Sequence, residues 1–352
     1  MFDALLRNFR WHRTADRWGP RRLLVVDLAD EGAAAVVMGR SGQAVQCVRS
    51  EKMPGLRLPA LLAGDEAVAQ LRRFAEEAQY ISVLMGGEES YVRLLNFPGR
   101  PGRDDAVAQQ VRQTLGVDEQ FDVCYAVMKT QEAENAAQFT VLAAAFRRDQ
   151  VDHLATALTA AGFTPVSLMH RGVVAANLAE TLTPGEGHAQ TSGFLHMGPS
   201  SCMLLLYAEG NLALARQFRM GSDLVVQSLM DSLKLDRDTA AKVLASGSFD
   251  VTANISPAVK SWMHQIAISL DFIERRYGKR IETLQLLSSG TGARVLREIL
   301  VASIGRTVEC PDLNERLGVA AAAADGAEPD DALWLALCEG RRVMQRSAPH
   351  AA

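Results

Sequence analysis

The chain has 352 residues, of which 48% are hydrophobic and 22% are charged, and its formal net charge is −4. This length predicts two or three domains with a sizeable buried core. The mildly acidic balance excludes a surface rich enough in cations to bind nucleic acid. The five cysteines form no CxxC pair, which indicates reduced thiols in a cytosolic protein.

Residues 1–21 form a basic amphipathic tail. Phe2, Leu5, Leu6 and Phe9 fall on one helical face among several arginines. The pattern is typical of a helix on an anionic membrane surface, and a solvated tail or a helix docked on its own domain are the open alternatives. The arginines exclude a signal peptide, and no apolar run reaches the roughly 20 residues of a membrane span.

The next segment predicts a sheet with one helix. Apolar runs at 23–27, 33–38, 44–49 and 80–85 predict strands, and Asp65 is the expected N-cap of a helix between the last two. That helix carries Val68, Leu71, Phe74 and Ala75 on one face.

Residues 88–165 predict an inserted α+β unit. Strands are expected at 89–98, 122–128 and 139–145. Asp104 is expected to cap one helix and Asp149 to begin another. The first of these helices repeats Val107, Val111 and Leu115, and Gly162 ends the second.

The second half repeats the plan of the first. Residues 194–218 predict three strands joined by a Gly-Pro-Ser-Ser turn and a hairpin, and a helix follows at 223–233. Ser256-Pro257 predicts the start of a long helix. Then come a strand at 284–288, a Gly-Thr-Gly turn, a helix and a short strand near Val308. Residues 321–331 predict a linker, and 331–344 a closing amphipathic helix.

Two glycine turns have the residues of phosphate-binding loops. Glycine lets backbone N–H groups approach an anion, and hydroxyl groups add donors. The candidate nucleotide-binding residues of these turns are Gly198, Ser200, Ser201, Gly221, Ser289, Gly290, Thr291 and Gly292. The histidines form no HxxxH or HxH pair, so no metal site is predicted.

The order of these elements resembles the FtsA/PilM branch of actin-like proteins, and most closely the PilM family of type IV pilus assembly proteins. The residues that carry the resemblance are 141–168, 206–221 and 268–293, the last with its YG helix end and SSGTGA loop. The resemblance implies an α/β fold of two duplicated RNase H-like halves with an SHS2-type insertion. Related MshI-type and GspL-type proteins share this plan and are not excluded.

The expected domains follow from this plan. The first half comprises 22–87 and 166–190, the insertion 88–165, the second half 191–345, and a short tail 346–352.

The family pattern also places Asp27 in a first phosphate loop. Here Ala29 replaces the family's glycine, no lysine follows, and Asp30 and Glu31 would repel phosphate. His196 stands where the second loop carries aspartate, and histidine is a poor ligand for Mg²⁺. We therefore expect a degenerate cleft that does not hydrolyse nucleotide, so no catalytic residue is assigned. ATP or ADP is the candidate ligand of this cleft, and an empty cleft is the alternative.

The resemblance implies a cytoplasmic scaffold at the inner face of the bacterial inner membrane. In the family, the protein binds the N-terminal cytoplasmic peptide of a PilN-type bitopic partner and links it to motor ATPases; self-association is a further expectation. The residues expected at the peptide groove are Leu94, Phe97, Val107, Val111 and Phe146. A role in the core of the insertion is the alternative for each of them.

Two other functions compete. An active actin-like ATPase needs a magnesium-binding carboxylate that the two loops do not supply. An FtsA-like filament protein needs a membrane-targeting helix, and residues 345–352 are too short and polar for one.

Overall fold

The computed structural model describes residues 21–29, 32–42, 44–87, 90–133, 136–182, 191–288, 292–311, 313 and 333–346. The chain divides into two compact units. Unit 1 comprises Met1–Leu178 and Leu313–Ala352, and unit 2 comprises Ala179–Asp312. Residues 1–20, the whole of the expected linker at 321–331 and the tail after 346 lie outside the described residues.

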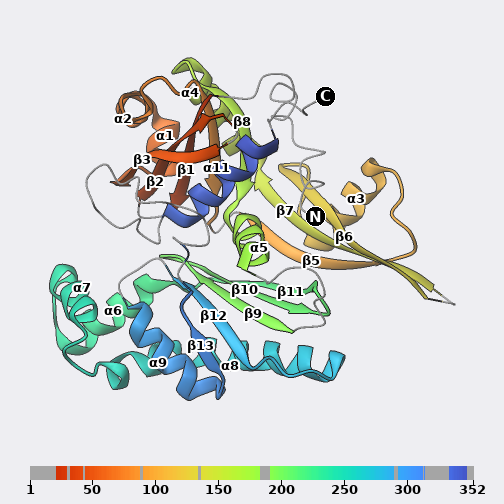
Figure 1. The fold of residues 1–352 in the computed structure, drawn as a ribbon, viewed down its shortest axis with the longest axis vertical. Helices are drawn as coiled ribbons and strands as arrows, with labels where there is room; N and C mark the ends of the chain where they lie inside the picture. Colours follow the sequence, from red (N-terminus) through yellow and green to blue (C-terminus); the bar gives the residue numbers. More distant parts are fainter. Residues whose placement is uncertain are drawn as a thin grey trace. The chain divides into compact units, whose positions relative to one another are not determined.

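Unit 1 is built on a five-stranded sheet in the order β3-β2-β1-β4-β8 (Figure 1). The strands are β1 (Arg22–Ala29), β2 (Gly32–Ser41), β3 (Ala44–Pro54), β4 (Tyr80–Met85) and β8 (Thr164–His170). β1 is central because its side chains from Leu23 to Leu28 are all buried. It pairs antiparallel with β2 and parallel with β4, and β4 pairs parallel with β8. The carboxyl ends of three parallel strands therefore meet at one edge.

The helices of unit 1 arise from apolar spacing that suits a helix. They are α1 (Leu58–Ala63), α2 (Asp65–Ala75), α4 (Arg148–Ala160), α5 (Arg171–Leu182, whose last turn lies in unit 2) and α11 (Trp334–Arg346). α2 begins at Asp65 and buries Leu71 and Phe74. Its N-cap is Gly64 and no side chain caps it, so the prediction of Asp65 as the N-cap is wrong by one residue. Gly162, with φ +82°, follows the end of α4 as predicted.

The insertion in unit 1 has its own three-stranded antiparallel sheet, in the order β5-β7-β6. Its elements are β5 (Tyr91–Pro98), α3 (Asp104–Leu115), β6 (Phe121–Ala133) and β7 (Ala136–Arg147). One face of this sheet packs on Val107, Val111 and Leu115 of α3. Helix α4, which follows β7, packs on β7 and also on α1 and β8.

Unit 2 repeats the sheet topology of unit 1, in the order β11-β10-β9-β12-β13. Its strands are β9 (Ser192–Met197), β10 (Cys202–Ala208), β11 (Asn211–Phe218), β12 (Thr283–Ser288) and β13 (Thr307–Glu309). Its helices are α6 (Ser222–Leu233), α7 (Arg237–Ser246), α8 (Thr252–Tyr277) and α9 (Ala293–Ile304). In both units an antiparallel meander is followed by parallel strands, as the two-halves prediction requires.

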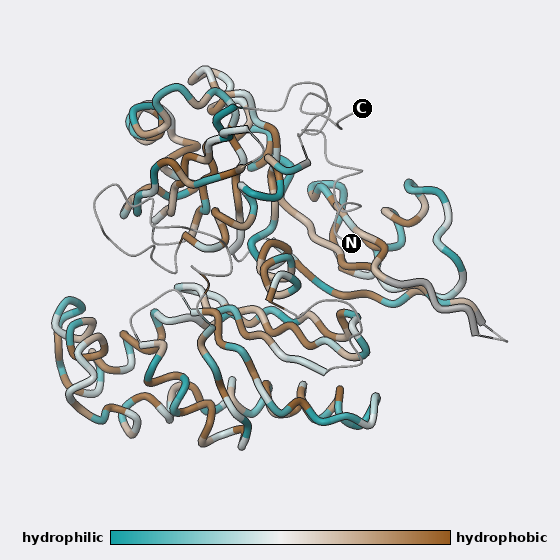
Figure 2. The backbone as a smooth tube through the Cα atoms, viewed as in Figure 1, coloured by the Kyte–Doolittle hydropathy of each residue, from teal (hydrophilic) through white to brown (hydrophobic). Residues whose placement is uncertain are grey.

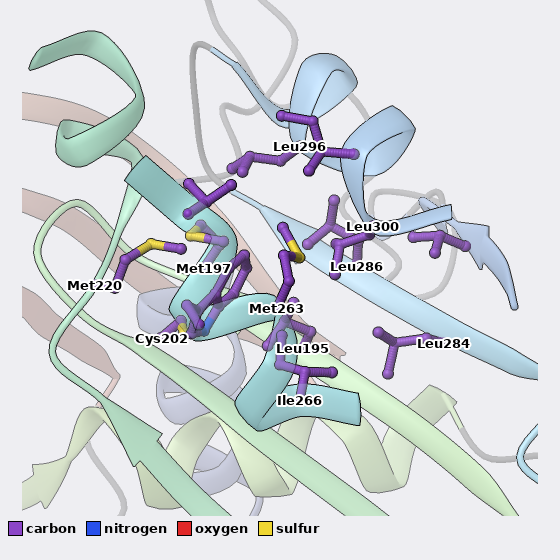
Figure 3. Packing of buried hydrophobic residues seen from close by; sticks show 14 of the residues in the cluster. Leu195, Met197, Cys202, Met220, Met263, Ile266, Leu284, Leu286, Leu296 and Leu300 are labelled. Carbon is purple, nitrogen blue, oxygen red and sulfur yellow. The ribbon is translucent and has the colours of Figure 1, made fainter. Parts of the chain in front are cut away.

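The core of unit 2 lies between its sheet and helices α6, α8 and α9. Figure 3 shows Leu195 and Met197 of β9 and Leu286 of β12 facing Met263 of α8 and Leu296 of α9. Figure 2 shows the same division along the backbone, with hydrophobic stretches on the central strands and hydrophilic ones at turns and helix surfaces. Apolar burial of this kind contributes roughly 25 cal/mol per Å² and holds α8 against the sheet.

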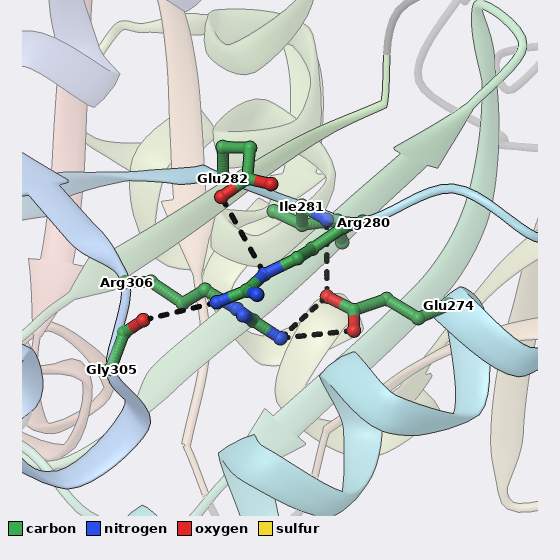
Figure 4. A network of polar contacts seen from close by, with 6 residues as sticks. All are labelled: Glu274, Arg280, Ile281, Glu282, Gly305 and Arg306. Atoms are coloured by element: carbon green, nitrogen blue, oxygen red, sulfur yellow. Dashed lines mark hydrogen bonds and ion pairs between the residues drawn. The ribbon is translucent and has the colours of Figure 1, made fainter.

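A polar network fixes the carboxyl end of α8 (Figure 4). Both carboxylate oxygens of Glu274 accept hydrogen bonds from Arg306, at 2.8 and 2.9 Å, and one of them also accepts the N–H of Ile281. Arg280 pairs with Glu282 and donates to the carbonyl of Gly305. The end of α8 is therefore tied both to the segment before β12 and to the turn after α9.

Two predicted boundaries are wrong. α8 begins at Thr252, four residues before the predicted start, and Pro257 lies inside it. The Ser256 hydroxyl donates to the carbonyl of Thr252 one turn earlier, so it does not act as an N-cap. The closing helix, expected in the second half, packs on β1, β2 and β3 of unit 1 instead. Buried hydrogen bonds from Ser82 and Ser167 to Glu339 of α11 explain this placement.

Candidate functional site

Asp27, which the family resemblance places in a phosphate loop, lies near the carboxyl end of β1. It is held by Arg171, which directly follows β8 at the start of α5. Nε of Arg171 lies 2.7 Å from Oδ1 of Asp27, and Nη2 donates to Oδ2 at 3.2 Å. Because β1, β4 and β8 are adjacent in that order, this ion pair connects β1 with the residue that follows β8.

The Asp27–Arg171 pair is almost entirely removed from water. The exposed fractions of the two side chains are 3% and 13%. Burial raises the pKa of Asp27, and the guanidinium group opposes that rise. The stem of Arg171 crosses Gly86, where an added Cβ would lie 3.2 Å from Cδ of the arginine. The carboxylate already has a cation, so a magnesium ion would have to displace a packed arginine. Asp30 and Glu31 lie outside the described residues.

The second candidate loop, in unit 2, follows β9 and is hydrogen-bonded to the start of α6. His196 is buried in β9, paired in register with Met203 of β10 and Leu287 of β12. The N–H groups of Ser222 and Asp223, which open α6, donate to the carbonyls of Gly198 and Pro199, each at 3.0 Å. These amides are the ones that a helix N-terminus would offer to a phosphate. They are already used by the loop itself, whose Ser200 and Ser201 are half-buried.

Gly221 has a packing role at this loop. A Cβ added at Gly221 would collide with the backbone carbonyl groups of Gly198 and Pro199. We therefore expect Gly221→Ala to destabilise unit 2 by about 2 kcal/mol, because backbone atoms must shift to make room. Thermal unfolding measures the loss, with Gly102→Ala as the control, since nothing lies within 4 Å of a Cβ there. Equal stability of the two variants would contradict this assignment.

The third candidate turn is described only at its end, because Ser289, Gly290 and Thr291 lie outside the described residues. Gly292 has φ +103°, a conformation that favours glycine, and a Cβ there would lie 3.2 Å from Cγ1 of Val225. It precedes α9 and its carbonyl accepts the N–H of Leu296. Gly292 thus has a structural reason to be glycine, whether or not a nucleotide binds.

The residues predicted for partner binding do not share one surface. Phe97, Val107 and Val111 are buried in the core of the insertion, between its sheet and α3. Leu94, half-buried, lies on β5 opposite Leu142 of β7, on the other face of the sheet. Phe146 is buried, and its ring centroid lies 5.6 Å from that of His170.

The sequence did not single out a buried serine–histidine pair in unit 1. Nε2 of His170 lies 3.0 Å from Oγ of Ser90, and Nδ1 accepts the N–H of Gly172. The proton is therefore on Nε2, which donates to Ser90, and the hydroxyl donates to the carbonyl of Gly87. Burial, aided by Arg171, lowers the pKa of His170 to about 3. A neutral histidine that already donates to the serine does not act as its base.

Within the described residues, no group of three or more His, Cys, Asp and Glu side chains is placed to hold a metal ion. No helix among them is long and apolar enough to cross a membrane. Among the described residues of the first two loops, the carboxylate of Asp27 is paired with Arg171, and the carbonyls of Gly198 and Pro199 accept the N–H groups that open α6.

A comparison with family models matches residues 116–319 to the family described as type IV pilus assembly protein PilM. The chain belongs to the PilM family. The match covers more than half of the chain and includes part of the insertion and all of the unit 2 sheet. It confirms the family resemblance seen in the sequence.

Solved structures support the fold of this PilM family member. The structure titled as a PilM–PilN type IV pilus biogenesis complex is 19% identical, covers 92% of this chain and 99% of its own, and has a TM-score of 0.71. That similarity confirms the predicted actin-like α/β architecture.

Two further structures resemble it less closely. A Bacteroides thetaiotaomicron protein with an actin-like ATPase fold is 9% identical, with coverages of 83% and 91% and a TM-score of 0.44. The ethanolamine utilization protein EutJ of Carboxydothermus hydrogenoformans is 13% identical, with coverages of 83% and 85% and a TM-score of 0.45. A search of curated proteins finds no match.

Proposed function

We propose that this type IV pilus assembly protein is a cytoplasmic scaffold that binds the N-terminal cytoplasmic peptide of a PilN-type inner-membrane protein. The observation that carries the proposal is the likeness, over 92% of the chain, to a protein solved as a PilM–PilN complex. The scaffold holds the peptide at the inner face of the membrane and does not turn over nucleotide. Contacts with motor ATPases and self-association are further parts of this proposal.

The insertion offers an edge to which an extended peptide can bind. β5 pairs with β7 alone among the described strands, so the backbone groups of its other edge have no strand beside them. Such an edge can accept main-chain hydrogen bonds from a peptide, while side-chain pockets give specificity. Of the five residues predicted for this role, Leu94 is the one that is not buried. Phe97, Val107, Val111 and Phe146 would then support the peptide site from within.

The peptide proposal is tested by calorimetry with the synthetic N-terminal peptide of the bitopic protein encoded beside this chain. We expect a micromolar or tighter complex, which Leu94→Arg weakens at least about tenfold, because the charge cannot be buried against an apolar peptide. Arg93→Ala is the matched control, since Arg93 is exposed and neighbouring strand residues point to opposite faces. If the wild-type chain binds no peptide, the scaffold function fails. If both variants bind as the wild type does, only the assignment to β5 fails.

From the residues of the two nucleotide loops, we expect this protein not to hydrolyse ATP. Asp27 is paired with Arg171, and His196 replaces the carboxylate of the second loop, so no described group of these loops is placed to hold magnesium against a phosphate. We expect phosphate release from ATP to equal that of a protein-free blank, with and without magnesium. Magnesium-dependent release that disappears in Asp27→Asn would favour the competing ATPase function.

A further inference from the structure

The outward face of α8 carries two neighbouring apolar side chains that lie outside the core of unit 2. Ile268 and Phe272 are 49% and 50% exposed. They are four residues apart, so their side chains are neighbours on the helix surface. Among the exposed large hydrophobic side chains of the described residues, Ile268 and Phe272 are the two that lie on α8.

The buried face of α8 is formed by other residues than Ile268 and Phe272. Val259, Met263, Ile266, Leu270 and Ile273 lie in the core of unit 2. At 100° per residue, Ile268 and Phe272 point about 200° and 240° away from Ile266. Together with Ser261, His264 and Arg275 they form a stripe with spacings of three and four residues, which we call the α8 stripe. This spacing is the one by which two helices pack along each other.

The charges around the α8 stripe have one predominant sign. Lys260 and Arg276 flank it on opposite sides, Arg275 lies on it, and Lys279 follows the helix. Asp271 is the one acidic residue on the same side. Arg276 stacks on the ring of Tyr277 at 5.7 Å. The chain as a whole has a net charge of −4, so this cationic surface differs from the average.

The helix that carries the stripe is firmly held. Arg216 of β11 donates to Gln265 at 2.6 Å and to Ser269 at 3.1 Å in the middle of α8. Glu274 and Arg306 fix its carboxyl end (Figure 4). A partner would therefore meet a rigid surface, and little ordering entropy would be lost on this side of the contact.

We propose that the α8 stripe binds an amphipathic, acidic helix of a protein partner. Its apolar side chains cover Ile268 and Phe272, and its carboxylates pair with Lys260, Arg275 and Arg276. A helix fits because the stripe runs along the axis of α8. A protein is favoured over a lipid surface because Ser261, His264 and Asp271 interrupt the broad apolar face that membrane-bound helices need. This surface is in unit 2 and is separate from the β5 edge of the proposed function.

The test uses the full chain and two synthetic amphipathic helices of equal apolar content. One carries Glu beside its Leu stripe and the other carries Lys. By fluorescence anisotropy we expect the acidic peptide to bind with micromolar affinity. Ile268→Ser/Phe272→Ser is expected to weaken this binding at least about tenfold, because both anchors are lost. Arg275→Glu is expected to weaken the acidic peptide and strengthen the basic one.

Val301→Ser is the matched control, because Val301 is 42% exposed on α9 and lies outside the stripe. It is expected to bind the acidic peptide as the wild type does, and all variants should keep the wild-type melting temperature. Equal binding of the acidic and basic peptides, or of the double variant and the wild type, overturns the proposal. The proposal is also overturned if the chain forms a dimer, or binds anionic phosphatidylserine vesicles, and the double variant abolishes that association. The occupant of the stripe is then a second copy or a membrane.

Discussion

Replacing Arg342 with methionine is expected to destabilise unit 1 by about 3–5 kcal/mol, because the Glu339 carboxylate is left buried without its cation. Glu339 is fully buried on α11, and its two oxygens accept hydrogen bonds from Arg342 at 2.6 and 2.7 Å. The hydroxyl groups of Ser82 on β4 and Ser167 on β8 donate to the same carboxylate, at 3.3 and 2.8 Å. This network fastens α11 to two strands of the sheet.

Thermal unfolding measures the effect of Arg342→Met, and a loss of this size lowers the melting temperature of unit 1 by roughly 10 °C. Hydrogen exchange should show faster exchange in α11, since the helix loses its anchor. Arg103→Met is the control: its partner Asp105 is 3.4 Å away and both side chains are largely exposed, so it should cost less than about 1 kcal/mol. If the two variants melt together, the buried network does not anchor α11.

A second comparison separates the missing cation from lost packing. In Glu339→Leu/Arg342→Met the buried pair is replaced by apolar side chains of similar size, which is often close to neutral for stability. We expect this double variant to be more stable than Arg342→Met alone. A double variant that is less stable would show that the aliphatic contacts of Arg342, not its charge, hold the helix.

The local elements of this fold could be predicted because their causes are local. The predicted strand 80–85 is the observed β4. α2 and α3 begin at Asp65 and Asp104, one residue before the predicted starts, because the predicted caps are the first helical residues. Apolar residues at helical or alternating spacing produce these elements wherever a core is available. The start of α8 was mispredicted because Ser256-Pro257 is a common helix opening that here lies one turn inside the helix.

The polar groups that decide the candidate site could not be predicted in the same way. Arg171 reaches Asp27 across 144 positions, and Glu339 reaches Ser82 across 257. No local pattern encodes such a pair, because it depends on which strands become neighbours in the sheet. Asp27 was identified from the family pattern, but the arginine that occupies its carboxylate was not. The α6 amides that bond to the second loop were also outside the reach of sequence reasoning.

Replacing Arg171 with methionine is expected to destabilise unit 1 by about 3–5 kcal/mol at neutral pH. The change removes the only cation that contacts Asp27 among the described residues, and leaves a buried carboxylate that is 3% exposed. Asp27→Asn/Arg171→Met is the matched control, because its buried amide carries no charge. We expect the control to recover much of the lost stability in thermal or denaturant unfolding.

The loss in Arg171→Met should depend on pH in a definite direction. Burial raises the pKa of Asp27 and Arg171 opposes the rise, so removing the arginine raises that pKa further. Between the pKa values of the unfolded and folded states, the folded protein binds more protons, and its stability therefore falls as pH rises. The difference between wild type and Arg171→Met should thus be larger at about pH 8 than at about pH 5, and the uncharged amide in Asp27→Asn/Arg171→Met should remove this dependence. A loss that is equal at both pH values, or larger at the lower one, would mean that Arg171 stabilises unit 1 through its packing over Gly86 and not by holding the charge of Asp27.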